Sequence, residues 1–287
     1  MIAPALVLSR VKELPALSAT ALRLAELARD ARSGAADFER VVRPDPALTA
    51  NLLRVANSAY FGLRCRAESV RQAVTVLGVK RVSEVAAAVA LAPVIPSRLP
   101  GYELEASAFW LHSVAVAVLA ERLSLQLGLR CPELTFTAGL LHDIGKLAIG
   151  AFVADDAPSI LIRTRGGLPF VAAEQAVLGV DHGQVGGLMA EAWSLPSAAA
   201  AAARWHHAPG AAPEGAPQAL IDLVHVADGL AHTLGLGADA GELARGVDAG
   251  VEDRLGFRVR DLEQTAGKSL DEIRELASLF APGGGNP

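Results

Sequence analysis

Apolar side chains recur along this chain every three or four residues, the spacing that places them on one face of an α-helix. The clearest example follows Asp45 and Pro46, where Leu48, Leu52 and Val55 repeat at that spacing. Aspartate is a favoured N-cap residue, and proline suits the first helical position because its missing N–H would have no partner there. This dipeptide therefore predicts that a helix begins at residue 46.

The same signals predict helices along the rest of the chain, and no stretch shows the strict alternation of a strand. Ser69 and Gln72 form a capping box for one helix, which Gly78 ends. A second capping box, Ser269 with Glu272, predicts the start of the last helix. The remaining expected helices cover residues 82–92, 107–127, 132–141, 182–193 (capped by Asp181), 196–207 and 219–234. The predicted fold class is all-α.

Residues 96–101, Pro-Ser-Arg-Leu-Pro-Gly, form the clearest cluster of helix breakers in the chain. We take this cluster as the boundary between an N-terminal helical lobe, residues 1–98, and a helical bundle, residues 99–280. Residues 281–287, which are rich in glycine, are expected to form a disordered tail.

Composition supports a helical, intracellular protein. The 287 residues are 52% hydrophobic but only 5% aromatic, so alanine, leucine and valine must build the core, and the first two favour helices. Cys65 and Cys131 form no Cys-x-x-Cys pair, which excludes a disulfide framework and a thiolate zinc site. The start of the chain does not resemble a signal peptide, and the longest apolar runs, residues 85–95 and 113–120, are too short to span a bilayer. We therefore expect a cytoplasmic protein that does not enter a membrane.

The formal net charge of −5 argues against nucleic-acid binding by the whole chain. Charge is uneven, however: residues 1–100 hold 14 Lys and Arg against 8 Asp and Glu, and the rest hold 12 against 23. This asymmetry fits either two parts with different partners or two solvated surfaces. A basic stretch beside Tyr60 and Phe61 could likewise meet a phosphate ligand or an acidic protein, or form a solvated face; it comprises Arg64, Arg66, Arg71, Lys80 and Arg81.

Histidine and aspartate supply the candidate chemistry, because all seven histidines follow residue 111 and two aspartates accompany them. Imidazole and carboxylate together suit Fe, Mn or Zn, and helical bundles build such sites with ligands from several helices. Two ions about 3.5–4 Å apart could hold a phosphoryl oxygen and activate a water. The candidate ligands are His112, His142, Asp143, His182, His206, His207 and Asp228.

The order of these residues resembles the HD superfamily of metal-dependent phosphohydrolases, and the extra histidines resemble the metal set of its HD-GYP branch. The whole chain most closely resembles the HDOD family, the HD-related output domain of bacterial signalling proteins. The motifs that carry this resemblance are Leu14-Pro15-Ala16-Leu17, Asp45-Pro46-Ala47-Leu48-Thr49, Leu52-Leu53-Arg54-Val55-Ala56-Asn57-Ser58-Ala59, Ala73-Val74-Thr75-Val76-Leu77-Gly78, Phe109-Trp110-Leu111-His112-Ser113, Leu140-Leu141-His142-Asp143-Ile144-Gly145-Lys146, His182-Gly183-Gln184-Val185-Gly186-Gly187 and Trp205-His206-His207.

The resemblance implies an N-terminal lobe packed on an HD-like bundle as one unit, with one or two divalent ions, Fe or Mn, bound by the seven candidates. It also implies that Asp143 bridges the ions and that Lys146 donates to a substrate phosphate; the alternative for Lys146 is a surface residue that caps the preceding helix. HDOD proteins are generally regarded as regulatory modules, and many have lost the ligands that this sequence keeps. The sequence departs from active cyclic-di-GMP phosphodiesterases, because no Gly-Tyr-Pro loop follows His207 and Ala108 stands where some three-metal members carry a glutamate.

Other residues near these motifs are assigned no chemical role. His225 and His232 flank Asp228 at helical spacing and could reach the site, but we expect them to be packing or surface residues. Asn57 and Ser58 are expected to form a structural end-cap. The tryptophans are expected to wall the bundle and exclude water; they are Trp110, Trp193 and Trp205.

Three functions are compatible with these features. We favour a stand-alone regulatory module that acts through contacts with a partner protein, its conformation set by a metal centre or by a nucleotide or phosphate ligand. The alternative is a metal-dependent phosphohydrolase or phosphodiesterase with Asp143 and Lys146 as its catalytic residues. A third hypothesis, a di-iron sensor of oxygen or redox state, needs the same metals, and no sequence feature singles it out.

Overall fold

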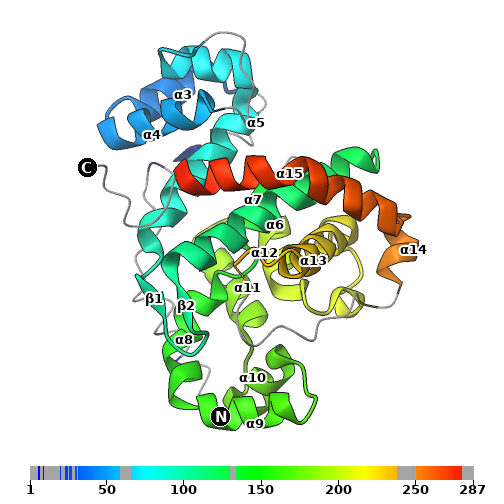
Figure 1. The fold of residues 1–287 in the computed structure, drawn as a ribbon. Coiled ribbons are helices and arrows are strands. Elements are labelled where there is room, and N and C mark those ends of the chain that lie inside the picture. The colour runs from blue at the N-terminus through cyan, green and yellow to red at the C-terminus, as the bar shows by residue number, and fades with distance from the viewer. Residues whose placement is uncertain are drawn as a thin grey trace.

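A computed structural model of the chain describes residues 32–279 apart from 59–65, 130–133, 238–247 and 249, together with a few positions before residue 31. Helices make up almost all of its regular structure, which confirms the predicted all-α class (Figure 1). The described elements are α3 (Ala35–Val42), α4 (Pro46–Ala56), α5 (Val70–Leu91), η1 (Ala92–Val94), β1 (Arg98–Leu99), β2 (Leu104–Glu105), α6 (Ala106–Gln126), α7 (Thr135–Leu141), α8 (Gly145–Asp155), α9 (Ala157–Arg165), α10 (Phe170–Leu178), α11 (His182–Ala192), α12 (Ser197–Trp205), η2 (Pro209–Ala211), α13 (Gln218–Thr233), α14 (Val251–Leu255) and α15 (Val259–Leu279).

The predicted helix starts in the N-terminal part hold in detail. The Asp45 side chain accepts a hydrogen bond from the Leu48 N–H at 2.9 Å and so caps α4. Ser69 accepts from the Gln72 N–H at 3.2 Å at the start of α5. Gly78 has φ 83° and ψ 160°, so α5 is two helical segments joined by a kink at the residue where we expected the first to end.

Asn57 fastens the loop that follows α4. Its side-chain amide donates to the carbonyls of Leu53 and Ala67 at 2.8 and 2.9 Å, and its Oδ1 accepts from the Ala67 N–H at 2.7 Å. These bonds close the end of the helix and tie it to the segment ten residues later. The structural end-cap expected for Asn57 is therefore confirmed.

The breaker cluster forms a small antiparallel hairpin, so the expectation that the chain holds no strand is wrong at this point. Arg98 pairs with Glu105 and Leu99 with Leu104, a ladder too short to show alternation in the sequence. Gly101, with φ +80°, sits in the turn, and a Cβ built there would lie 2.5 Å from the Ala154 backbone nitrogen. The hairpin therefore packs directly on α8. The division into two lobes near residue 98 stays a prediction.

Helix α6 runs through the centre of the bundle and is buried along nearly its whole length. It is also long and apolar enough to cross a membrane, as is the stretch Thr135–Asp155, which is longer than the apolar runs of the sequence suggested. In each case 78% of the window is buried inside the protein, which is the pattern of core helices. The buried core is continuous from Phe38 in α3 to Ile273 in α15.

Helix α15 lies across α6 and holds the C-terminal part of the chain against the bundle (Figure 1). The Trp110 indole donates to the Ala277 carbonyl at 3.0 Å, so this tryptophan walls the bundle as expected. The predicted start at Ser269 is wrong. The helix begins ten residues earlier, where the Asp261 carboxylate accepts from the Arg258 N–H, and the Ser269 hydroxyl donates to the Thr265 carbonyl inside the helix.

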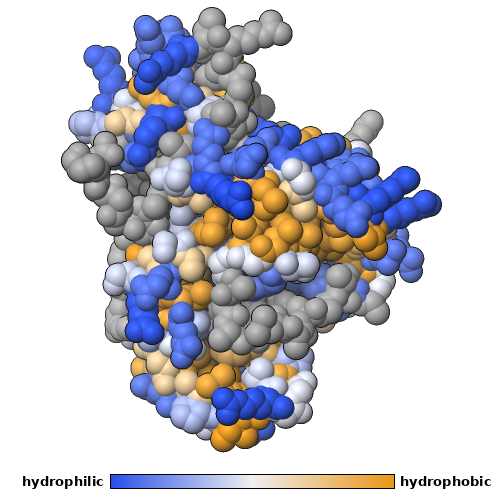
Figure 2. Space-filling view, viewed as in Figure 1, coloured by the Kyte–Doolittle hydropathy of each residue, from blue (hydrophilic) through white to orange (hydrophobic). Residues whose placement is uncertain are grey.

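The surface shows how the basic stretch is used. Arg71 pairs with Glu39 at 2.8 Å, and Arg81 pairs with Glu84 at 3.0 Å and with Glu121, so these two cations serve packing between helices. Tyr60, Phe61 and Arg64 and the side chain of Lys80 lie outside the described residues. Figure 2 shows hydrophilic side chains over α14 and α15 and an apolar area at the foot of the molecule, where α9 lies.

Candidate metal centre

Five separate parts of the bundle bring the seven predicted ligands together. His112 comes from the middle of α6, and Asp228 comes from α13. The turn between α7 and α8 carries His142 and Asp143, the first residue of α11 is His182, and His206 and His207 follow α12. These residues form two groups. Group one is Asp143, His182, His206 and His207, and group two is His112, His142 and Asp228. Within each group, one ligand atom of each residue lies within 4.8 Å of those of the others.

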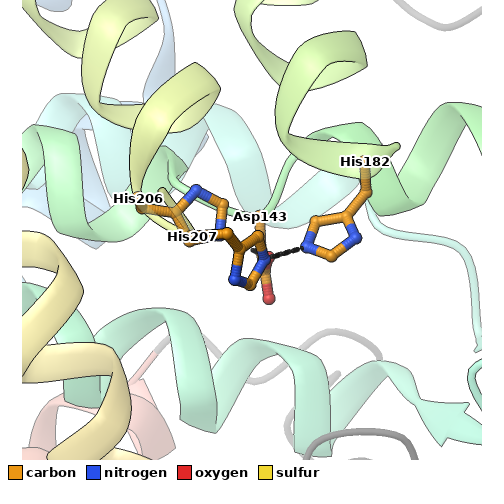
Figure 3. Close-up of side chains that lie close together, drawn as sticks. All are labelled: Asp143, His182, His206 and His207. Atoms are coloured by element: carbon orange, nitrogen blue, oxygen red, sulfur yellow. Dashed lines mark hydrogen bonds and ion pairs between the residues drawn. The ribbon is translucent and has the colours of Figure 1, made fainter. Parts of the chain in front are cut away.

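In group one the rings of three histidines surround the carboxylate of Asp143 (Figure 3). Asp143 Oδ1 lies 3.3 Å from His182 Nε2 and 3.6 Å from His206 Nε2. His207 Nε2 lies 2.5 Å from His182 Nε2. Nitrogen and carboxylate donor atoms therefore converge at one point.

Group two is arranged around Asp228, and Asp143 connects it to group one. Asp228 Oδ1 lies 3.1 Å from His112 Nε2 and 3.7 Å from His142 Nε2. The second oxygen of Asp143, Oδ2, lies 3.4 Å from His142 Nε2 and 3.9 Å from His112 Nε2. Asp143 thus presents one oxygen to each group, the arrangement of a carboxylate that bridges two cations.

Hydrogen bonds at Nδ1 orient the rings. The Nδ1 atoms of His112, His142 and His206 lie 3.1, 2.7 and 2.8 Å from the carbonyl oxygens of Leu236, Gly139 and Ala203. A carbonyl only accepts, so at His142 and His206 these hydrogen bonds assign the proton to Nδ1 and leave a lone pair on Nε2. His112 Nε2 has a second acceptor, Asp228 Oδ1, at 3.1 Å. Such anchoring of the outer nitrogen is typical of histidines that bind metals.

Three inward-facing atoms then have no hydrogen-bond partner among the described residues, although all are buried: His142 Nε2, His206 Nε2 and Asp143 Oδ1. Buried polar atoms are normally hydrogen-bonded, and leaving one without a partner costs about 1–3 kcal/mol. A divalent cation in each group would satisfy lone pairs and carboxylate together. The residues therefore indicate a metal site.

At three of the ligands the electrostatics favour the form that metals bind. Burial, followed by the rings of His142 and His232, lowers the pKa of His112 to about 3, so this imidazole is neutral. Burial also holds the pKa of His206 well below its usual value. Burial by itself would raise the pKa of Asp143, but the Lys146 ammonium and the His142 ring hold it well below its usual value. Neutral imidazoles and an ionised carboxylate are the states required of ligands.

Lys146 is fully buried, so the alternative of a surface lysine is wrong. Its Nζ lies 2.7 Å from Asp143 Oδ2, with each side chain only 2% exposed. The same ammonium lies 5.4 Å from the centre of the Tyr102 ring. Lys146 therefore balances the charge of the carboxylate that joins the two groups.

Glu174 and Tyr102 belong to the site but carry no signal in the sequence. Glu174 Oε2 accepts from His182 Nδ1 at 2.7 Å, and its Oε1 accepts from the Tyr102 hydroxyl at 2.5 Å. Burial opposes protonation of His182, but the carboxylates of Glu174 and Asp143 outweigh it and raise its pKa to about 10. The same negative charges would favour a metal cation at His182 Nε2, where the cation would take the place of the proton.

The two remaining histidines differ. His225 Nδ1 donates to the His206 carbonyl at 2.7 Å, and its Nε2 accepts from the Asp248 N–H at 2.9 Å, which confirms a packing role. His232 does not fit the packing or surface role expected of it, because its Nε2 lies 3.3 Å from Asp228 Oδ1. Its ring also lies 4.5 Å from that of His112.

Close approach of α8 to α11 positions His182 relative to Asp143. A Cβ built on Gly145 would lie 1.9 Å from the His182 carbonyl oxygen and 2.6 Å from the Gly186 nitrogen. Both are backbone atoms, so the two helices would have to separate. Replacing Gly145 by alanine is therefore expected to destabilise the fold by about 3 kcal/mol, which urea unfolding would measure.

Gly267 provides the control for that substitution, because a Cβ built there meets nothing within 4 Å. Alanine is a better helix former than glycine, so Gly267→Ala should leave stability equal or raise it by about 0.5–1 kcal/mol. Equal stability of the Gly145 and Gly267 variants would contradict the close packing of α8 on α11.

With the fold and the site described, the chain can be compared with known proteins. The family model of the HDOD domain matches residues 14–209. The chain belongs to the HDOD family. An HDOD domain protein of unknown function from Geobacter sulfurreducens is 25% identical, with 96% of each chain covered and a TM-score of 0.76.

Two further proteins are similar to this HDOD chain. A candidate phosphohydrolase from Shewanella amazonensis SB2B has the same fold, with 24% identity, a TM-score of 0.75, and coverage of 96% of this chain and 98% of that one. An uncharacterised protein of Treponema pallidum (strain Nichols) is 23% identical over 211 residues, 71% of this chain. The HDOD chain spans only 40% of that protein's length.

Proposed function

We propose that this HDOD protein is a regulatory module that contacts a partner protein and whose conformation is set by a buried pair of metal ions. The observation that carries the proposal is the burial of the site: no side chain among His142, His182 and His206 is exposed at all. A centre enclosed in this way is suited to holding helices in place. Similarity to a candidate signal transduction protein from Marinobacter aquaeolei VT8 and to the candidate phosphohydrolase from Shewanella amazonensis SB2B supports a role in signalling or phosphoester chemistry without deciding between them.

The ligand chemistry supports Fe or Mn as the metal. Group one offers three imidazoles with one carboxylate, and the described residues of both groups include no thiolate. Nitrogen and oxygen ligands of this kind suit Fe and Mn, and a bridging carboxylate suits two ions held close together. When bound, such ions would supply Lewis acidity as well as structural cross-links.

A chain of contacts connects this centre to the β1–β2 hairpin. His182 is held by Glu174, and Glu174 accepts from Tyr102, which lies in the turn of the β1–β2 hairpin. A metal ion that replaces the proton on His182 therefore changes the charge beside the hydrogen bond between Glu174 and Tyr102. We infer that the hairpin transmits the state of the metal centre towards the surface.

A single experiment tests this function against its alternative. Protein purified anaerobically without chelator should contain about two Fe or Mn per chain, as expected for a dinuclear site. Hydrogen exchange of the hairpin, residues 98–105, and of α10 should slow when metal is bound, because the ligands then fix His182. Equal exchange with and without metal would contradict the conformational role.

A phosphohydrolase is the second candidate, favoured by the position of Lys146. The ammonium lies beside the bridging carboxylate, where it could donate to a phosphate oxygen once cations replace it as the partner of Asp143. The same metal-loaded and metal-free samples should be incubated with nucleotides and a chromogenic phosphodiester. Turnover that requires the metal would favour this candidate, whereas none would leave the regulatory module as the function.

A further inference from the structure

Group two, as described so far, is one histidine short of group one. Group one combines Asp143 with three imidazoles, whereas group two has only two imidazoles, together with Asp228 and the second oxygen of the bridging Asp143. Fe and Mn ions accept about six ligands, so an additional imidazole can be accommodated and would give the two groups the same number of imidazoles. Among the described residues, His232 is in a position to supply it.

His232 lies on the same face of α13 as Asp228, four residues further along the helix. Residues at this spacing stand one above the other, and pairs of ligands four residues apart on a helix can bind the same ion. His232 Nε2 lies 3.3 Å from Asp228 Oδ1, and the His232 side chain is 9% exposed. Its ring is tilted by 41° against the ring of His112, with the centres 4.5 Å apart.

Three ring nitrogens therefore surround one carboxylate oxygen. Asp228 Oδ1 lies 3.1 Å from His112 Nε2, 3.7 Å from His142 Nε2 and 3.3 Å from His232 Nε2. His112 Nε2 is within hydrogen-bond distance of this oxygen. His142 Nε2 carries a lone pair, because its Nδ1 is anchored on a carbonyl, so it cannot donate and two acceptor atoms face each other there. A cation among them would remove that repulsion.

We propose that His232 is a further protein ligand of the ion held by His112, His142, Asp228 and the bridging Asp143. The inference rests on the metal centre proposed above and extends it to a residue outside the predicted ligand set. Each ion then has three imidazoles; Asp143 bridges the two ions, and Asp228 is an additional carboxylate of the second ion. His232 is the most exposed member of its group, so it is the ligand at the solvent side of that ion.

A competing role for His232 is that of a donor to Asp228, which would position the carboxylate without touching the metal. Two variants separate these roles. His232→Ala removes both the ligand and the donor, whereas in His232→Gln the amide keeps an N–H that can reach a carboxylate. Thr233→Ala, at the neighbouring exposed position of α13, is the matched control for changes at this end of the helix.

The probe is Co²⁺, added anaerobically to the full-length, metal-free protein and titrated against a chelator of known affinity. The visible bands of Co²⁺ depend on the number and type of its ligands. His232→Ala should weaken one of two ions by about 100-fold, leave the other unchanged and alter the bands of the weakened ion. His232→Gln should behave like His232→Ala, and Thr233→Ala like the native chain. Thermal unfolding of the metal-free variants checks that each is folded.

The outcomes test the metal centre and the role of His232 as a ligand separately. If the native protein binds no Co²⁺, the metal centre itself is wrong and the inference fails with it. Two ions in the native protein, with native affinities and bands in His232→Ala, would overturn the inference and leave the centre standing. Native behaviour of His232→Gln beside a weakened His232→Ala would also overturn it, because a donor to Asp228 would then be sufficient.

Discussion

Replacing Asp143 by asparagine is expected to abolish metal binding in both groups. One oxygen of this carboxylate lies 3.3 Å from His182 Nε2 and the other 3.4 Å from His142 Nε2, so a single residue serves both halves of the site. Asparagine preserves the shape but removes the charge. We expect metal content to fall from about two ions per chain to well below one, measured by elemental analysis of anaerobically purified protein.

The substitution also affects folding, because Asp143 balances the charge of buried Lys146 at 2.7 Å. Removing one partner of a buried ion pair typically costs about 3–5 kcal/mol. The double variant Asp143→Asn, Lys146→Met removes both charges and should recover most of the lost stability in urea unfolding. It should still bind no metal.

That pair of variants separates loss of ligand from loss of fold. Full metal content in the stable double variant would contradict the bridging role of Asp143. Stability of the single variant equal to that of the metal-free native chain would contradict the ion pair with Lys146.

Replacing Glu174 by glutamine is expected to weaken the ion of group one by about 10–100-fold, the usual effect of changing a residue that orients a metal ligand. Glu174 is completely buried and accepts from both the backbone N–H and Nδ1 of His182. Both bonds go to Oε2, so the carbonyl oxygen of glutamine can keep them, but it carries no charge and His182 becomes a weaker ligand. Competition with a chelator would measure the loss, and the ion of group two should be unaffected.

Tyr102→Phe is the matched control, because it removes only the hydroxyl that donates to Glu174. It should weaken the same ion less than Glu174→Gln does. An equal effect of both variants would assign the orienting role to the whole hydrogen-bonded unit, and no effect of Glu174→Gln would refute the orientation of His182 by this carboxylate.

The pH dependence of the stability of the metal-free protein provides a second test of Glu174→Gln. The pKa of His182 is raised from 6.5 to about 10, burial opposing the shift and Glu174 causing most of it. Because the folded pKa lies above the unfolded value, the charged ring stabilises the fold fully below pH 6.5, and this contribution is lost as pH rises towards about 10. The free energy of unfolding of Glu174→Gln should therefore change less with pH over that range than that of the native chain.

The sequence by itself determined the helical class, most of the helix starts that it predicted, and the candidate ligands that the structure brings together. Caps such as Asp45 are local, since the side chain bonds the backbone three residues on, so neighbouring residues suffice to predict them. The failure at Ser269 shows the limit of such signals: the same residue types inside α15 bond the helix itself, at Thr265. The hairpin at residues 98–105 was missed because a ladder of two pairs has no detectable period.

Only the tertiary structure decided which residues meet across helices. Glu174 lies on α10 and orients His182 on α11, and the sequence does not show that these helices bring them together. Lys146 is buried and His232 faces Asp228 because of how α8 and α13 are rotated in the bundle. Helix spacing in a sequence determines which residues share a face, but packing determines what that face contacts. The identity of the candidate ligands was therefore readable from the sequence, whereas the residues that orient and complete the site were not.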